Sequence, residues 1–162
     1  MDGEVAGTPE YMPPEQANGE VAALGPHSDV YGMGAILYTL LAGHPPYVPD
    51  GTRRNPYAVL ARVQEGPPRS LGELGVDVAP ELEAICEKAM ARRIPDRYPD
   101  MEAFATDLRA YLERRVVSAY ATGPVQEFRK WVARNPVVAA AAAAVVAAVL
   151  GLGGWALKER GE

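Results

Sequence analysis

Residues that begin and end α-helices constrain the fold of this chain more than any other feature. Ser28 precedes a long apolar segment that ends at Gly43, Asn55-Pro56 begins a second segment, and Asp100 precedes a third. Side-chain oxygens of such residues accept hydrogen bonds from the free N–H groups at helix N-termini, and glycine favours the left-handed conformation that ends many helices. No segment has the alternating pattern of a β-strand. The sequence therefore predicts an all-α fold.

The expected helices cover residues 13–17, 29–42, 56–65, 80–92 and 101–114. The second is apolar nearly all round, so we expect it to be buried on most sides. It contains Gly32 and Gly34, which cost about 1 kcal/mol each relative to alanine inside a helix and indicate close approach by another element. Two later helices carry apolar faces made of Leu82, Ile85, Cys86, Ala89 and Met90, and of Met101, Phe104, Ala105, Leu108, Tyr111 and Leu112.

Charge and cysteine content exclude several classes of function. The net charge is −5, and residues 1–52 contain seven acidic side chains and no Lys or Arg. Nucleic-acid binding needs clustered cations, so we expect no nucleic-acid partner. The chain has one cysteine, Cys86, and two histidines. A disulfide within the chain is excluded, and we expect no metal site and a core-filling role for Cys86.

Residues 137–157 form an uncharged apolar segment of the length that crosses a membrane. Its 21 residues would extend about 31 Å as a helix, against about 30 Å for the hydrocarbon core of a bilayer. Five cations precede it, namely Arg114, Arg115, Arg129, Lys130 and Arg134. We therefore expect a single transmembrane helix with its N-terminal side in the cytoplasm, and the lipid bilayer as a partner. Nine of the residues are alanine, so a buried helix of a soluble domain is the alternative.

Three motifs occur in an informative order. The first is Gly7-Thr8-Pro9-Glu10-Tyr11-Met12-Pro13-Pro14-Glu15, the second runs from Ser28-Asp29-Val30-Tyr31-Gly32 to Pro45-Pro46-Tyr47, and the third is Pro95-Asp96-Arg97-Tyr98-Pro99-Asp100. They resemble the end of the activation segment, the central helix and the last turn of the C-terminal lobe of serine/threonine protein kinases. With the apolar segment that follows, the chain resembles bacterial, membrane-anchored members of that family. Pro13 departs from the pattern, which usually has alanine there.

This resemblance implies four parts and a set of site residues. Residues 1–115 would be a partial kinase domain, 116–136 a basic juxtamembrane segment, 137–157 the transmembrane helix and 158–162 a short tail. The resemblance implies that six consecutive residues contact the protein substrate, namely Gly7, Thr8, Pro9, Glu10, Tyr11 and Met12. Among them, Thr8 would hydrogen-bond the catalytic aspartate of a complete domain and help to select serine or threonine. The alternative for Thr8-Pro9 is a simple turn.

Glu15, Asp29 and Arg97 are the structural residues of the resemblance. It implies a buried ion pair between Glu15 and Arg97, for which two unrelated surface charges are the alternative. Asp29 would hold the catalytic loop of a complete kinase, or serve only as an acidic residue in the first turn of its helix. His27 next to Ser28 has no acidic residue placed to orient it, so we do not expect a nucleophile and base there.

Phosphoryl transfer needs groups that do not occur in these 162 residues. There is no Gly-x-Gly-x-x-Gly, no His-Arg-Asp and no Asp-Phe-Gly, and the first lysine is Lys88 in a predicted helix. We expect no catalytic, cofactor-binding or metal-binding residue in the chain, whereas the complete family domain uses ATP and Mg²⁺. The sequence thus indicates a serine/threonine kinase fragment that is inactive alone. A membrane-tethered, pseudokinase-like docking module and a truncated gene remnant are the alternatives.

Two further expectations concern partners. Protein substrates or another kinase chain would bind the kinase portion, and the helix from Val30 to Leu41 would expose apolar surface if the rest of a kinase lobe is absent. In the apolar segment, small residues recur every four positions at Ala139, Ala143, Ala147 and Gly151. Such spacing lets membrane helices approach closely, so weak self-association is an expectation.

Overall fold

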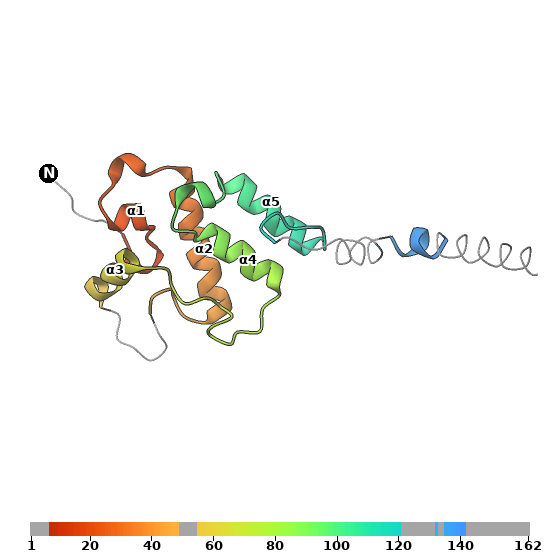
Figure 1. The fold of residues 1–162 in the computed structure, drawn as a ribbon, viewed down its shortest axis with the longest axis horizontal. Coiled ribbons are helices and arrows are strands. Elements are labelled where there is room, and N and C mark those ends of the chain that lie inside the picture. Colours follow the sequence, from red (N-terminus) through yellow and green to blue (C-terminus); the bar gives the residue numbers. More distant parts are fainter. Residues whose placement is uncertain (1–6, 49–54, 121–131, 133–134, 142–162) are drawn as a thin grey trace, which may run out of the picture. The chain divides into compact units, whose positions relative to one another are not determined.

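The computed structural model describes residues 7–48, 55–120, 132 and 135–141. The chain divides into two compact units. The first comprises Met1–Glu113 and Val117–Ala121, and the second comprises Arg114–Val116 and Thr122–Glu162. In the second unit, residues 136–141 are helical. All the helices labelled in Figure 1 belong to the first unit.

The first unit consists of helices joined by loops and turns. In chain order the elements are η1 (Pro9–Tyr11), α1 (Pro14–Ala17), η2 (Val21–Ala23), α2 (Pro26–Ala42), α3 (Pro56–Glu65), α4 (Pro80–Ala89), η3 (Ile94–Asp96) and α5 (Met101–Leu112), where η denotes a 3₁₀-helix. No strand occurs among the described residues. The predicted all-α class is therefore confirmed for this part of the chain.

Local capping explains where three of these helices begin or end. Asn55 accepts hydrogen bonds from the backbone N–H groups of Tyr57 and Ala58 at N···O distances of 3.1 and 3.4 Å, and Asp100 accepts one from Ala103 at 2.8 Å. Gly43 ends α2 in the left-handed region at φ 79°. These three predicted caps are confirmed, because each depends on residues only a few positions apart in the sequence.

The predicted start of α2 was wrong by three residues. The helix begins at Pro26, with Gly25 as its N-cap, so Ser28 lies inside the first turn. Proline suits the first position because it needs no N–H partner there and its φ is already helical. The Ser28 hydroxyl accepts a hydrogen bond from the Gly25 N–H at 3.2 Å and donates one to Glu15 at 2.9 Å. The ends of α4 and α5 also come earlier than predicted, at Ala89 and Leu112.

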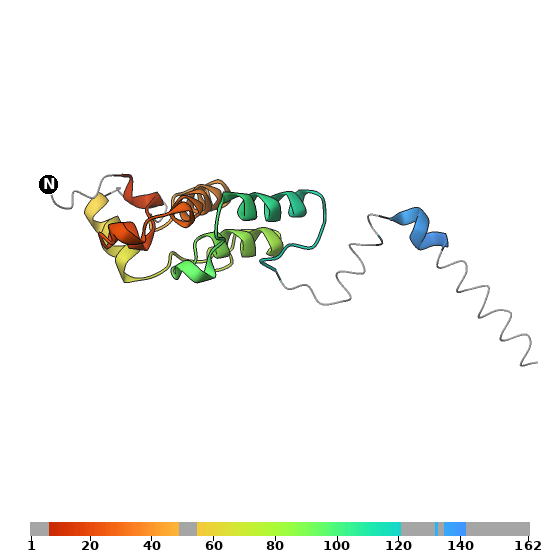
Figure 2. The ribbon, with the colours of Figure 1, turned by 90° about the horizontal axis from the view of Figure 1, so that it is seen from above.

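The largest core cluster lies where α2, α4 and α5 pack against one another (Figure 1, Figure 2). Its buried members are Val30, Ile85, Ala89, Tyr98, Phe104, Ala110 and Val117. A second cluster joins α1 and α3 through Met12, Ala17, Tyr47, Val48, Val59 and Val63. The Tyr47 hydroxyl reaches from that cluster to the hydroxyl of Tyr31 in α2, 2.9 Å away.

One side of α2 remains exposed, although the helix was predicted to be buried on most sides. Met33, Ile36 and Leu40 are 40%, 44% and 77% exposed. The separate expectation that this helix exposes apolar surface is confirmed. In α5, Met101 and Leu112 are exposed instead of lying on the buried face, and Asp107 and Ala110 take places there. The predicted face is confirmed at Phe104, Leu108 and Tyr111, which lie in or against the core, and is wrong at Met101 and Leu112.

The predicted transmembrane segment lies mostly outside the described residues, which include only 137–141 of it. Within the parts of the chain that the structure describes, no helix has both the length and the apolar character needed to cross a bilayer. The predicted basic segment 116–136 is described at 116–120, 132 and 135–136. Residues 117–120 of this segment belong to the first unit, with Val117 in the core and Ala119 and Tyr120 packed against it.

Candidate functional site

The candidate substrate-binding residues form a tight turn on the surface of the first unit. Pro9–Tyr11 is a 3₁₀-helix, closed by hydrogen bonds from the Tyr11 N–H to the Thr8 carbonyl at 3.1 Å and from the Met12 N–H to the Pro9 carbonyl at 3.3 Å. Gly7 precedes the turn at φ 139°, a backbone conformation that residues other than glycine rarely adopt. The segment thus has a fixed backbone shape that depends on a glycine at its start.

Alternate sides of this segment face solvent and core. Gly7 and Thr8 are exposed, whereas Glu10 and Met12 are buried at 6% and 3% exposure. Met12 packs with Val59 and Val63 of α3, which fixes the turn against that helix. The Thr8 hydroxyl makes no capping hydrogen bond to η1. The structure therefore presents Thr8 outward and uses Met12 to hold the segment in place.

Glu15 and Arg97, which are 82 residues apart, meet in a buried bidentate ion pair. Arg97 Nη1 lies 2.7 Å from Glu15 Oε1, and Nη2 lies 2.7 Å from Oε2. The side chain of Arg97 is 0% exposed and that of Glu15 is 3% exposed. Paired, parallel N–H···O bonds are the strongest geometry for arginine and a carboxylate. The predicted contact is confirmed, and the alternative of two unrelated surface charges is excluded.

Backbone carbonyls complete the surroundings of the Arg97 guanidinium. Nε donates to the Ala91 carbonyl at 2.6 Å, Nη1 also donates to that of His27 at 3.3 Å, and Nη2 to that of Arg92 at 3.2 Å. Its Cζ atom lies 5.0 Å from the centre of the Tyr31 ring. Every N–H group of this buried cation therefore has an acceptor, which is the condition for a buried charge to be tolerated.

The same contacts determine the ionisation of Glu15. Burial alone raises the pKa of a carboxyl group, but hydrogen bonds from Arg97 and Ser28 oppose it and hold the pKa of Glu15 below its usual value. Glu15 is therefore an anion at neutral pH. It joins α1, which directly follows the Gly7–Met12 segment, to the start of α2 through Ser28 and to the loop before α5 through Arg97.

Asp29 lies in the first turn of α2 and is exposed. Its position near the helix N-terminus is favourable for a carboxylate because of the partial positive charge there. The Nε2 atom of His27 lies within hydrogen-bond distance of the Ala23 carbonyl, at 2.8 Å. Cys86 is buried, and its Sγ lies 3.6 Å from the Gly34 carbonyl, so its predicted core-filling role is confirmed.

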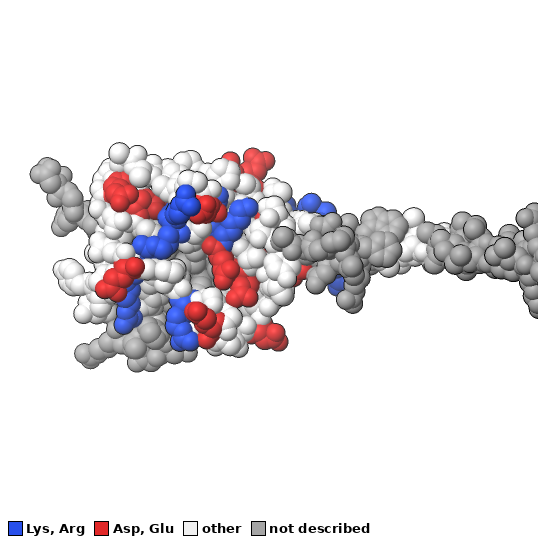
Figure 3. Space-filling view, viewed as in Figure 1, with Lys and Arg blue, Asp and Glu red and all other residues white. Residues whose placement is uncertain are grey.

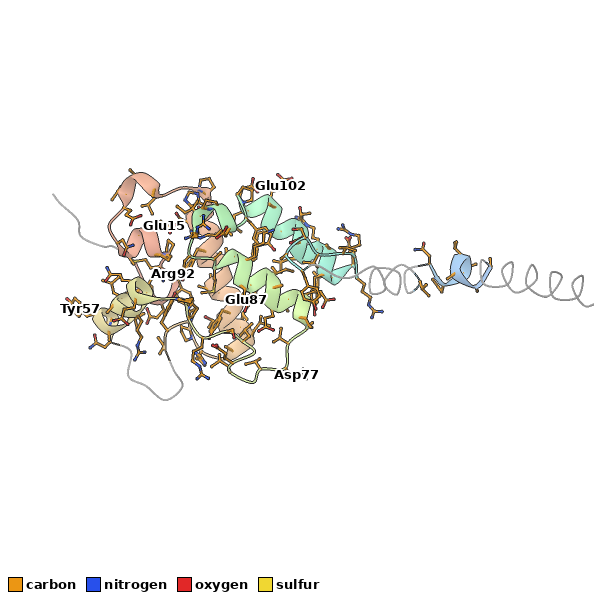
Figure 4. All side chains as sticks on the ribbon, viewed as in Figure 1. Glu15, Tyr57, Asp77, Glu87, Arg92 and Glu102 are labelled. Carbon is orange, nitrogen blue, oxygen red and sulfur yellow. The ribbon has the colours of Figure 1, made fainter. Side chains whose placement is uncertain are left out.

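Two residues that hold the unit together were missed by the sequence analysis. Arg92 donates from Nη1 to the carbonyls of Val63 and Gly66, both at 2.6 Å, and from Nη2 to that of Gln64 at 3.0 Å. It thereby caps the C-terminal end of α3, and Figure 4 shows it beside that helix. The second is Asp107, in the buried face of α5. The groups that Arg92 and Asp107 bind lie 9 to 29 residues away in the sequence. No helical periodicity therefore identified these two residues.

The charges on one face of the first unit are mixed in sign, as Figure 3 shows. Among the described residues, no three His, Cys, Asp or Glu side chains are grouped as metal ligands would be. The candidate site is thus the surface segment Gly7–Met12, followed by a helix that the buried Glu15–Arg97 ion pair holds in place.

Comparison with known proteins gives the relationship. No family model matches the chain. It is 34% identical over 132 residues to the "Probable serine/threonine-protein kinase PknB" of Bifidobacterium longum, an alignment that covers 81% of this chain and 18% of that protein. It is 38% identical over 104 residues to the "Serine/threonine-protein kinase PknB" of Mycolicibacterium smegmatis, covering 64% and 16%.

A third relative carries a different specificity in its name. The "Tyrosine-protein kinase MasK" of Myxococcus xanthus is 39% identical over 114 residues, which are 70% of this chain and 17% of that protein. The chain spans less than a fifth of the length of each of these three relatives. From these similarities, together with a helical fold consistent with part of a kinase C-terminal lobe, we conclude that the chain is homologous to the bacterial serine/threonine protein kinases.

Proposed function

We propose that this chain supplies the substrate-side and supporting part of a protein kinase C-terminal lobe. The reaction of such a domain is ATP-dependent phosphorylation of protein serine or threonine side chains. The observation that carries the proposal is the bidentate Glu15–Arg97 pair, which fixes α1, the helix that begins two residues after Met12. A buried pair with every donor satisfied is a costly feature that a surface turn without a function would not need.

In this proposal the exposed side of the segment contacts the substrate. Thr8 directs its hydroxyl toward a catalytic aspartate supplied by the rest of the domain, and residues 7–12 bind the substrate next to the acceptor. The exposure of Gly7 and Thr8 and the burial of Met12 support this arrangement. The choice of serine or threonine as acceptor is part of the proposal, since one relative is named a tyrosine kinase.

The 162-residue polypeptide, in this proposal, does not transfer phosphate by itself. Its sequence contains no phosphate-binding glycine loop, catalytic-loop aspartate or magnesium-binding Asp-Phe-Gly. The exposed apolar side chains Met33, Ile36 and Leu40 of α2 support an additional packing partner, such as the remainder of a kinase domain. We expect no heat of binding when the purified chain is titrated with millimolar ATP. Saturable micromolar binding would contradict this part of the proposal.

A chimera tests the proposed role directly. The segment of the Mycolicibacterium smegmatis kinase that matches this chain is replaced by the corresponding residues of this chain, and phosphate transfer from radiolabelled ATP is measured. We expect an active chimera. Its Thr8→Ala variant should lose most activity and Thr8→Ser should retain it, because serine keeps the hydroxyl. Glu102→Gln is the matched control, since Glu102 is exposed on α5.

Two other results would count against the proposal. A folded chimera with no activity would indicate that the segment cannot serve a catalytic domain. If the isolated chain then bound an intact kinase, the docking-module alternative would explain the exposed side of α2 better. Equal activity of Thr8→Ala and the unchanged chimera would remove the role proposed for Thr8.

We also propose that residues 137–157 anchor the chain in a membrane, with the kinase portion on the cytoplasmic side. Support comes from the sequence, which has no charge over 21 residues and five cations in the preceding stretch. The test is extraction of membranes at alkaline pH, which should leave the chain in the pellet. Release into the supernatant would indicate the alternative of a buried soluble helix.

A further inference from the structure

Asp107 is a buried carboxylate that gathers hydrogen bonds from two separate parts of the first unit. It is 4% exposed. Its Oδ2 accepts from the Tyr98 hydroxyl at 2.8 Å, the Ser118 hydroxyl at 2.7 Å and the Ala119 N–H at 3.0 Å, and its Oδ1 accepts from the Ser118 N–H at 2.8 Å. Asp107 is therefore attached to the core through Tyr98 and to the chain after α5 through Ser118 and Ala119.

The residues that Asp107 holds form a turn outside any helix. The Tyr120 N–H donates to the Val117 carbonyl at 3.2 Å, which closes the turn. Val117 is buried at 1% exposure in the cluster of α2, α4 and α5, and Tyr120 packs against that cluster. The Asp107 carboxylate and the apolar contacts of Val117, Ala119 and Tyr120 thus hold residues 117–120 in place.

The attachment depends on the charge of Asp107. None of its four donors is a cation, and the nearest cationic group in these contacts is Lys88 Nζ, 3.4 Å from the Ser118 hydroxyl and 4.4 Å from the Tyr98 ring centre. Hydrogen bonds to a charged acceptor are about twice as strong as neutral ones. An amide in place of the carboxylate would turn N–H donors toward the donors of the turn, so several contacts would be lost together.

We propose that Asp107 is a latch that holds residues 117–120 on the first unit. With the latch closed, Val117, Ala119 and Tyr120 keep their places against the core of α2, α4 and α5. With the latch open, residues 117–120 separate from that core while the helices stay packed. At about 3.3 Å per extended residue, these four residues then add at most about 13 Å of free chain.

Amide hydrogen exchange in the 162-residue chain tests the latch. In the unchanged chain, the Ser118 and Ala119 amides should exchange slowly. Asp107→Asn should accelerate both by about 10- to 100-fold, the range expected for hydrogen bonds to a charged group. The amide of Ala89 in α4 should keep its rate, because the helices remain packed. Glu102→Gln on the same helix is the matched control and should change none of these rates.

Two milder variants decide the outcome if Asp107→Asn unfolds the whole unit. Tyr98→Phe and Ser118→Ala each remove one hydroxyl donor and keep the carboxylate, and each should accelerate exchange at Ser118 and Ala119 about 2- to 10-fold. The proposal is overturned if the two amides are unprotected in the unchanged chain, or if no variant changes them. It is also overturned if Ala89 accelerates equally in the milder variants, since Asp107 would then stabilise the core as a whole.

Discussion

Gly34 of α2 lies so close to α4 that a Cβ atom built on it would be 2.8 Å from the Cβ of Ala89. The Met90 Cγ would be 2.9 Å away. Gly32, two residues earlier, differs sharply, because a Cβ there would meet nothing nearer than the Tyr11 carbonyl oxygen at 3.7 Å. Only one of the two glycines is therefore required by packing.

This contrast predicts opposite effects of the same substitution. Gly34→Ala should lower the free energy of unfolding by about 1–3 kcal/mol, because overpacking forces α2 and α4 apart. Gly32→Ala should leave it unchanged or raise it by about 0.5–1 kcal/mol, since alanine is the better helix former and has room. Urea unfolding followed by circular dichroism measures both. Equal destabilisation by the two substitutions would contradict the close approach at Gly34.

Removing one partner of the Glu15–Arg97 pair should cost far more than removing both. Glu15→Gln or Arg97→Met leaves a charge buried without its partner, and each should lower the free energy of unfolding by about 3–5 kcal/mol. The double variant should lose clearly less than the sum of the single losses. Glu102→Gln is the control, because it removes the charge of an exposed carboxylate. Additive losses would mean that the pair contributes no coupling.

The stability of the first unit should fall in acid. Burial alone would raise the pKa of Asp107, but hydrogen bonds from Ser118, Tyr98 and Ala119 hold it below the usual value, and the pKa of Glu15 is lowered in the same way. A lowered folded-state pKa stabilises the fold above the unfolded pKa, about 3.9 for Asp and 4.3 for Glu, and that contribution is lost as pH falls through the folded-state value.

The measurement is the urea concentration at the midpoint of unfolding, taken at several values between pH 3 and pH 7. Because both groups are ionised above pH 6, they should change this midpoint little there, and it should decline below about pH 4. Asp107→Asn should be less stable at pH 7 and should show a shallower decline. An acid decline of the same steepness in that variant would show that Asp107 does not contribute to it.

Cys86 should be nearly inert toward alkylation in the folded chain. Burial raises the pKa of its thiol to about 12, and the neighbouring carboxylates of Glu87 and Glu83 add to this. The thiolate is the reactive form, so labelling by iodoacetamide at pH 8 should be about 10³-fold slower than in urea. Since Cys86 is the one cysteine of the sequence, mass spectrometry reports it without ambiguity. Rapid labelling of the folded chain would indicate an opening between α2 and α4.

The sequence predicted features that depend on near neighbours and failed where distant ones decide. Asn55 and Asp100 cap their helices as expected, since the N–H groups they bind are two or three residues away. Ser28 is not the N-cap of α2, because the helix begins earlier, at Pro26. From the third helical position its hydroxyl accepts from the Gly25 N–H and donates to Glu15, 13 residues earlier in the chain. The Glu15–Arg97 contact was predicted only through a resemblance between motifs.

Close approach was predicted at both Gly32 and Gly34 of α2. It is confirmed at Gly34, which contacts α4, but not at Gly32. Asp107 and Arg92 were missed for a common reason. Asp107 binds backbone groups of the turn at residues 118–119, and Arg92 binds carbonyls at the C-terminal end of α3, and the positions of both sets of groups follow from tertiary packing.

Arg92 and Arg97 lie five residues apart, and each holds a different earlier part of the chain: Arg92 the end of α3, and Arg97 the carboxylate of α1. The Arg92 carbonyl also binds Arg97 directly. The spacing between the two arginines is therefore set from both sides. Inserting or deleting a single residue between them would detach α1 or α3 even though every side chain was still encoded, so homologous chains should vary in length elsewhere and keep this interval constant.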